Sequence, residues 1–463
     1  MSQTNQLQIT NSYRNIIQLA LPIAIAILIP QLNILTNTLF LGNYTPLNAT
    51  FTTQDLLSAT GIAGIYYLTL SMIGYGLSSG ILMLMSRSAG SNDLVQIGKI
   101  FSNGLVLSLL LSGVLMFASW FLAPFLFEHA ISNESVKMGA ISFIRIRIWG
   151  LPFIIVCQLS NSFFLATSNS QKIIYGSFAQ TLANILFDYL LIFGLFSFPE
   201  MGLNGSAVAS VISEVVYMIV AYIILQKSKD FAKYPIRYFL NIDWVLIRKM
   251  FIKSSPLIIQ YFLSIGAWEV FFIFVEHLGK VESATSQLLR TVFGVVGIAA
   301  WALGSTSNSM VSNLIGQQKL DEVVPLVKKV ILISFSIAFF LGIFILLFPV
   351  AFLQLLTHDP QIIEAGVMPL RIVVLATWTL SVSTVFFNSV LGIGNTRMVM
   401  YFEMIAILLY LLYSFIVIEQ WRLPLAYAWA SEFVYWFSLL SMCAYYLLSG
   451  RWKHYIARTR TLV

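Results

Sequence analysis

The chain has 463 residues, of which 58% are hydrophobic and only 10% are charged, and its mean hydropathy is +0.85. A soluble protein carries about 25% charged residues, so this composition excludes a water-soluble globular fold. The net charge of +7 suggests no nucleic-acid partner, because a membrane explains the basic residues better. Cys157 and Cys443 lie in apolar runs without a CxxC or Cys/His cluster, which predicts neither a disulfide nor a structural metal site.

Twelve apolar runs long enough to cross a bilayer follow one another along the chain. They are about twice as long as the strands of a membrane β-barrel and are apolar on every side. The sequence therefore predicts an all-α integral membrane protein with twelve transmembrane helices. The predicted spans cover roughly residues 16–41, 56–85, 101–126, 137–163, 173–195, 204–226, 254–276, 284–312, 330–356, 365–391, 398–418 and 424–449.

The basic residues support this count. With the N-terminus inside, 19 of the 26 Lys and Arg residues fall in inside segments, and only Lys137, Lys280 and Arg422 fall in outside loops. This asymmetry is the one that the positive-inside rule predicts when both termini are cytoplasmic. We therefore expect a bacterial inner-membrane protein with both ends in the cytoplasm.

The two halves of the chain resemble each other. Gly90 matches Gly316 at an offset of 226 residues, and Leu165–Ser170 matches Leu391–Thr396 at the same offset. Six spans per half return the chain to the same side, so we expect two six-helix lobes related by a pseudo-two-fold axis along the membrane normal. The predicted parts are an N-terminal lobe (1–226), a cytoplasmic linker (227–253) and a C-terminal lobe (254–463). This architecture favours transport by alternating access, with a scaffold or a membrane enzyme as the alternatives.

Several motifs in a fixed order resemble the multidrug and toxic compound extrusion (MATE) family over nearly the whole chain. The most specific pattern lies in the fifth and sixth spans. The resembling segments are Ala20–Pro22, Gly74–Gly80, Arg145–Pro152, Asn184–Gly194, Gly202–Ser210, Pro256–Gly279 and Gly392–Arg397.

The resemblance implies an antiporter that exports amphiphilic, often cationic compounds in exchange for H⁺ or Na⁺. It assigns the coupling cation to polar residues of the N-terminal lobe, which here include Asn184 and Asp188. Ser210 stands where the family often has Thr, and Pro22 stands at a proline associated with bending of the first span, a possible gating kink.

The sequence departs from the family pattern at three positions. Asn37 stands where the family usually has an Asp late in the first span. Ser264 and Leu380 stand where some members carry acids in the seventh and tenth spans. The expected cation site of the N-terminal lobe is thus reduced to one carboxylate.

That carboxylate, Asp188, is expected in the outer half of the membrane. Asn184 lies one helical turn earlier on the same face, and Asn37 is expected at comparable depth. A carboxylate costs about 2.5–3.5 kcal/mol at the centre of a membrane helix, so its presence suggests a function. Protonation and Na⁺ binding at Asp188 would compete, which would couple transport to either ion. A purely structural, hydrogen-bonded Asp is the alternative.

The other acids are predicted to have different roles. Glu269 lies about 140° around the seventh span from Ser264 and either lines a cleft as a polar site of the C-terminal lobe or pairs with Arg290. Glu214 and Glu432 occupy matched repeat positions, which favours a structural role in each lobe. Glu403, soon after Arg397, is expected at the membrane interface.

The basic residues in or near the spans are assigned to the membrane surface. Arg145, Arg147 and Arg371 lie near predicted span ends, where long side chains reach toward water. Arg87 opens a cytoplasmic loop and is assigned to a gate region.

These observations predict a secondary active exporter rather than an enzyme, with no cofactor other than H⁺ or Na⁺ as coupling ion. The expected partners are the lipid bilayer and a small lipophilic or cationic substrate, and the expected state is a monomer. A flippase or exporter for a lipid-linked or other specific metabolite is the main alternative. Few basic residues within the spans disfavour phosphate binding, and the four scattered His residues disfavour a membrane enzyme. The absence of a soluble output domain disfavours a receptor.

Overall fold

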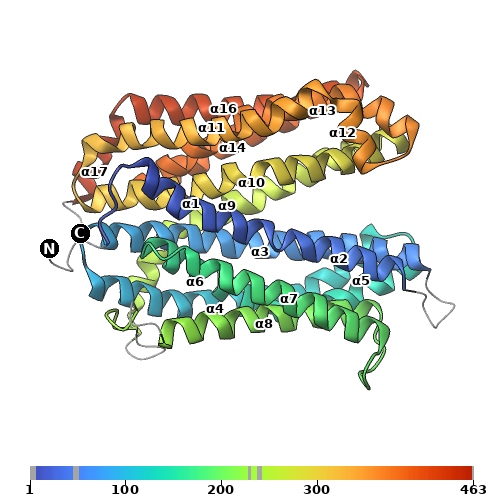
Figure 1. Cartoon of the computed structure of the whole chain (residues 1–463), viewed down its shortest axis with the longest axis horizontal. Helices are drawn as coiled ribbons and strands as arrows, with labels where there is room; N and C mark the ends of the chain where they lie inside the picture. Colours follow the sequence, from blue (N-terminus) through green and yellow to red (C-terminus); the bar gives the residue numbers. More distant parts are fainter. Residues whose placement is uncertain (1–6, 45–51, 228–230, 237–241, 461–463) are drawn as a thin grey trace. The chain divides into compact units, whose positions relative to one another are not determined.

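A computed structural model describes residues 7–44, 52–227, 231–236 and 242–460, and every regular element within these ranges is helical. Figure 1 shows these helices, coloured along the sequence from the N-terminus to the C-terminus. In chain order the elements are α1 (Tyr13–Leu28), α2 (Gln31–Gly42), α3 (Thr53–Gly90), α4 (Leu94–Ala130), α5 (Glu134–Arg147), η2 (Ile148–Gly150), α6 (Leu151–Ala166), α7 (Gln171–Phe193), α8 (Leu203–Lys227), α9 (Trp244–Glu276), α10 (Lys280–Gly316), η3 (Leu320–Glu322), α11 (Val323–Leu347), α12 (Pro349–Leu356), α13 (Pro360–Ile393), α14 (Thr396–Ser414), η4 (Phe415–Gln420), α15 (Leu425–Trp429), α16 (Ser431–Leu448) and α17 (Arg451–Arg460).

Ten helical segments of the described chain are long and apolar enough to cross a membrane, and a bent pair, Leu425–Leu448 with Arg451–Arg458, raises the number to eleven. These segments overlap eleven of the twelve predicted spans. The remaining predicted span, 16–41, corresponds to two shorter helices, α1 and α2, which meet at Ile29 and Pro30. Proline at this position lacks the N–H that a continuous helix would use. An integral membrane protein is therefore confirmed, whereas the arrangement as twelve helices in two lobes stays a prediction.

The chain divides into two compact units. Unit 1 contains 1–24, 86–92 and 255–463, and unit 2 contains 25–85 and 93–254. Helices α1, α3 and α9 each contribute to both units. The predicted domain boundaries differ from this division because the first 24 residues group with the C-terminal half. Moreover, α9 begins at Trp244, inside the predicted linker.

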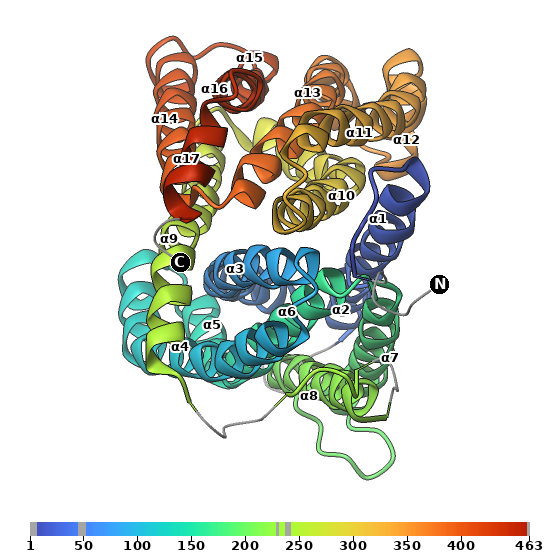
Figure 2. The ribbon, with the colours of Figure 1, turned by 90° about the vertical axis from the view of Figure 1, so that its left-hand side faces the viewer.

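Within each unit the helices pack as a bundle, which is clearest in the view along the helices in Figure 2. In unit 2, α7 packs along α8, and α8 also contacts α5 and α6, while α2 packs on α7. In unit 1, α13 is central and contacts α10, α11 and α16, and α14 packs on α16. These contacts bring side chains from helices distant in sequence into the polar clusters described below.

The internal repeat is visible in the backbone. Helices α3 and α10 end at the matched glycines Gly90 and Gly316. Two turns share the unusual left-handed conformation at the same offset of 226 residues: Asn92 (φ 56°) matches Gln318 (φ 66°), and Ser168 (φ 60°) matches Gly394 (φ 94°). Positive φ is uncommon in residues other than glycine, so its recurrence supports a duplicated structure.

Apolar side chains are exposed along the outer faces of the helices. On α4, Phe117, Phe121 and Phe125 follow one another at helical spacing and are 57–72% exposed. An exposed stripe of this size is unfavourable in water and is expected where lipid covers the helix. The buried faces carry the apolar core and, within it, polar side chains such as Asp188, Glu214 and Glu403.

Candidate functional site

Asp188 on α7 faces Asn37 on α2 inside unit 2. The Asp188 side chain is fully buried, and the Asn37 amide covers its carboxyl group. An ionised carboxylate only accepts hydrogen bonds, so the amide nitrogen is the atom that faces it. In this orientation Asn37 Nδ2 lies 2.6 Å from Asp188 Oδ2, 3.1 Å from Oδ1 and 3.2 Å from Ser206 Oγ on α8. The structure thus brings together two of the residues predicted to form the cation site.

Asn184 and Ser210, the other two predicted residues, form a second contact between α7 and α8. Asn184 is buried and its Nδ2 lies 3.5 Å from Ser210 Oγ. Asn184 and Asp188 are one turn apart on α7, so the two contacts lie on one face of that helix. All four predicted residues therefore belong to one polar surface shared by α2, α7 and α8.

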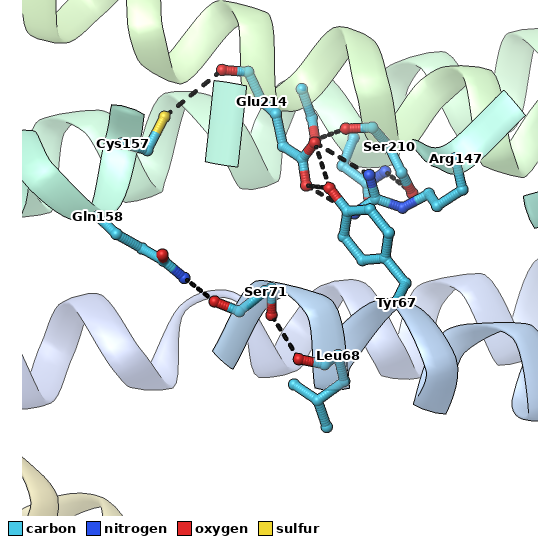
Figure 3. Close-up of polar contacts among 10 residues, drawn as sticks. Tyr67, Leu68, Ser71, Arg147, Cys157, Gln158, Ser210 and Glu214 are labelled. Atoms are coloured by element: carbon cyan, nitrogen blue, oxygen red, sulfur yellow. Dashed lines mark hydrogen bonds and ion pairs between the residues drawn. The ribbon is translucent and has the colours of Figure 1, made fainter. Parts of the chain in front are cut away.

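Arg147, Glu214 and Tyr67 form a buried charged cluster in the same unit (Figure 3). Arg147 at the end of α5 makes a bidentate ion pair with Glu214 on α8, with Nη2–Oε1 at 2.6 Å and Nη1–Oε2 at 2.9 Å. The Tyr67 hydroxyl from α3 lies 3.1 Å and 3.0 Å from the two carboxylate oxygens. The Arg147 guanidinium also lies over the Tyr67 ring, 3.6 Å from its centre. Every charge in the cluster is thus compensated by direct contact.

The expectation that Arg147 reaches toward water at a span end is wrong. Its side chain is only 14% exposed because Glu214 and Tyr67 hold it inside the unit. Arg147 also acts on Asp188 electrostatically, but its ion pair is with Glu214. Sequence reasoning missed this because Arg147 and Glu214 are 67 positions apart, a separation that leaves no local pattern.

Glu403 on α14 lies in a second polar cluster, inside unit 1. Its side chain is 1% exposed, so the expectation of an interfacial Glu403 is wrong. Ser264 Oγ on α9 donates to Glu403 Oε1 at 2.9 Å, and the Tyr435 hydroxyl on α16 donates a short hydrogen bond to the same oxygen. Gln260, one turn before Ser264, also bonds to Glu403. Sequence reasoning placed Glu403 by its distance from the span end rather than by the helix face that it occupies.

Glu432 on α16 is also buried in unit 1, at 3% exposed. Trp436 Nε1 donates to Glu432 Oε2 at 2.9 Å, and the Trp268 and Tyr410 side chains lie near the same carboxyl group. These contacts agree with a structural hydrogen-bonding role, which stays a prediction.

Glu269 on α9 pairs with Arg290 on α10, one of the two arrangements predicted for it. Arg290 Nη2 lies 3.1 Å from Glu269 Oε1, and the side chains are 19% and 23% exposed. The guanidinium lies 4.6 Å from the centre of the Trp268 ring. This pair is more open to its surroundings than the one formed by Arg147 and Glu214.

Pro22 lies inside α1, which continues beyond it to Leu28. The break in the first predicted span is at Ile29 and Pro30 instead. A gating role of Pro22 stays a prediction.

The chemical capacity of these clusters is to bind a proton or a small cation. Within the described ranges, no three His, Cys, Asp or Glu side chains are placed to hold a metal ion together. Asp188, with Asn37, Ser206 and Asn184 around it, can hold a proton on its carboxyl group or present oxygens to a single cation. A chain with membrane-length helices and isolated carboxylates buried between them has the features of a membrane transporter.

Comparisons with known proteins identify the family. A family model described as MatE matches residues 17–190 and 256–416. The probable multidrug resistance protein NorM of Thermotoga maritima is 22% identical over 453 residues, which cover 97% of this chain and 95% of that protein. The probable NorM protein of Synechocystis is 26% identical over 351 residues, covering 76% of this chain and 72% of that protein. The chain therefore belongs to the MatE family, and the resemblance seen in the sequence is confirmed.

Solved structures show the same fold. The outward-facing conformation of a multidrug resistance MATE family transporter of the MOP superfamily has a TM-score of 0.85 at 17% identity, covering 99% of this chain and 98% of that chain. A MOP superfamily transporter from Pyrococcus furiosus, described as having a binding pocket of reversed polarity and a different suggested function, has a TM-score of 0.82 at 16% identity, with coverage of 99% and 98%. One fold thus accommodates binding pockets of different character, so the residues of this chain must decide its function.

Proposed function

We propose that this protein is a secondary active multidrug exporter that expels amphiphilic, often cationic compounds in exchange for H⁺ or Na⁺, with Asp188 as the coupling carboxylate. The observation that carries the proposal is the burial of Asp188 against Asn37, with no ion pair to it within the described residues. The relatives named as multidrug resistance proteins support the export of such compounds.

The Asn37 amide suits a carboxyl group that changes its charge. When Asp188 is ionised, Asn37 Nδ2 donates to it; when Asp188 is protonated, a turned amide can accept its proton through Oδ1. Asn37 can therefore serve both states of Asp188 without loss of a hydrogen bond. The replacement of the usual family Asp by Asn leaves a single carboxylate at this site, so one H⁺ or one Na⁺ neutralises it.

Helix α2 supplies the movement that access to Asp188 requires. Asp188 is fully covered, whereas Asn37 is half-buried on a twelve-residue helix separated from α1 by the break at Pro30. A shift of α2 away from α7 would uncover the carboxyl group without unfolding a long helix. Substrate binding that favours one position of α2 would then be linked to the release of the proton or ion.

Na⁺ is the second ion that this geometry can hold. When the Asn37 amide turns its oxygen toward this group, oxygen atoms of Asp188, Asn37 and Ser206 lie together, and a hard cation prefers such ligands. The coupling ion is therefore decided by whether Na⁺ competes with H⁺ at this carboxyl group. The bacterial inner membrane, cytoplasmic termini and a monomeric state belong to the same proposal.

The proposal is tested by efflux of a fluorescent cationic dye into inverted vesicles under an imposed pH or Na⁺ gradient. Asp188→Asn should retain the folded protein but abolish the dependence of transport on the gradient. Glu134→Gln is a matched control, because its exposed carboxylate contacts only Lys137, and it should transport like the wild type. Undiminished gradient dependence in Asp188→Asn would show that the coupling assignment is wrong.

A further inference from the structure

Glu403 is a deeply buried carboxylate surrounded by hydrogen-bond donors from two other helices. Ser264 and Gln260 approach it from α9, and Tyr435 approaches it from α16. Ser264 and Tyr435 both bond to one carboxyl oxygen, Oε1, and Gln260 is a third neutral partner of the same carboxyl group. The 1% exposure of Glu403 excludes bulk water from reaching this carboxyl group freely.

The groups that face Glu403 carry no positive charge. In the chain as described, its only titratable neighbours are Tyr435 and Cys443, both from α16, and Glu432 acts on it through Tyr435. No Lys, Arg or His of the described residues forms an ion pair with Glu403, whereas Arg147 and Arg290 do so with Glu214 and Glu269. An ionised carboxylate without a cation is strongly disfavoured in such surroundings, and a proton removes its charge.

Two hydroxyl groups connect this buried carboxyl to the half-buried parts of the cluster. Ser264 and Tyr435 are both partly exposed, and their oxygen atoms lie 3.1 Å apart. Either hydroxyl can pass its own proton to Glu403 while it takes one from a hydronium ion in the adjoining water, which leaves a neutral hydroxyl, a protonated carboxyl group and a water molecule. The contacts thus provide a path as well as a binding site.

The buried Gln260 supplies an independent indication of the bound proton. Gln260 is 2% exposed, and its Oε1 is a buried acceptor that lacks a donor in the described structure. Because its amide lies against Glu403, a proton on the carboxyl group can become the donor for a turned Gln260 amide. Protonation of Glu403 would therefore supply the donor that Gln260 Oε1 lacks.

We propose that Glu403, with Ser264, Tyr435 and Gln260, forms a second proton-binding site of this exporter, separate from Asp188 and located in unit 1. The site takes a proton rather than Na⁺, because hydrogen-bond donors occupy the carboxyl oxygen that would otherwise face a cation. This inference rests on the proposed ion-coupled export and adds a second group that binds and releases H⁺.

Infrared difference spectroscopy of the full chain in lipid bilayers tests this site without any transport assay. Protonated and ionised carboxyl groups absorb differently, so a pH titration resolves the groups that bind protons. We expect Glu403→Gln to remove one pH-dependent carboxyl component that Asp188→Asn and the control Glu269→Gln both retain. Addition of Na⁺ at fixed pH should leave this component unchanged.

A second variant covers the case in which Glu403→Gln does not fold. Tyr435→Phe removes one donor to the ionised form, so the midpoint of the Glu403 component should move to higher pH by about one unit. A Glu403→Gln spectrum with every wild-type component, an unmoved midpoint in Tyr435→Phe, or displacement of the component by Na⁺ would each overturn the proton site.

The two proposals fail in distinguishable ways. If no substrate is exported but the Glu403 component is present, the proposed function falls and the proton site remains. If export follows the ion gradient but Glu403 does not titrate, the proposed function stands and the second site falls.

Discussion

Glu214 and Glu432 occupy matched positions of the two halves but are compensated in different ways. Glu214 has a bidentate arginine, Arg147, and a tyrosine hydroxyl. Within the described residues Glu432 has a neutral donor, Trp436, and no ion pair. The duplicated helices have thus kept the carboxyl group, while the surrounding charge differs between the units.

The difference shows that position in a repeat does not fix the electrostatic role of a buried acid. Glu214 forms a closed ion pair, in which loss of either partner leaves a buried charge. Substitution of Glu432 would leave no unpaired charge among its neighbours, because the group bonded to it is neutral. The same substitution should therefore have unequal effects at the two positions.

Replacement of each glutamate by glutamine is expected to give the largest contrast. Glu214→Gln leaves Arg147 buried without a counter-ion and should cost about 3–5 kcal/mol of stability. Glu432→Gln keeps a side chain of the same shape among neutral donors and should cost about 1 kcal/mol or less. Denaturation midpoints of the two purified variants measure the difference, and equal losses would contradict the assigned electrostatic contrast.

Removal of both charges of the N-terminal pair is expected to recover much of that loss. Arg147→Met combined with Glu214→Leu leaves no buried charge, so the double variant should be more stable than Glu214→Gln by about 2 kcal/mol or more. A double-mutant cycle on the same denaturation assay measures the coupling. Additive losses from the two single substitutions would show that the pair is not a closed unit.

The sequence predicts these features unevenly, for physical reasons. Hydrophobic run length locates the spans, and helical spacing relates Asn184 to Asp188, because both depend on neighbours along the chain. The contact between Asn37 and Asp188 was expected from their comparable depth, but its geometry depends on how α2 packs on α7.

Contacts over long sequence separations were not predictable in this way. The position of Glu403, only seven residues inside α14, suggested the membrane surface, yet α9 and α16 cover it completely. A buried acid at Glu214 requires a compensating group, and the basic residues of the fourth predicted span were the available signal for Arg147. Span position alone gave the wrong result because burial depends on neighbouring helices as well as on depth.

Gly150 tests how tightly the cluster of Arg147 and Glu214 is packed. A Cβ atom added there would lie 2.2 Å from Glu214 Oε2 and 2.5 Å from Arg147 Nη1, so Gly150→Ala should cost about 1–3 kcal/mol. Gly113 on α4 of the same unit has nothing within 4 Å of the added atom, and Gly113→Ala should be neutral or slightly stabilising. Denaturation of both variants measures the change in stability. Equal stabilities would show that the side chains of the cluster can move aside for the added Cβ atom without destabilising the fold.

The smallest effect is expected at the pair of Glu269 and Arg290. Both side chains keep about a fifth of their surface exposed, and a single hydrogen bond joins them. Glu269→Gln should therefore cost about 0–1 kcal/mol, well below Glu214→Gln, even though each acid has an arginine partner. Arg290 retains its contacts with the Trp268 and Phe272 rings after the substitution, which provides a second reason for a small loss. A loss as large as that of Glu214→Gln would show that neither the greater exposure nor the single hydrogen bond makes this pair weaker. The stability of Arg290 would then depend on the rings that cover it.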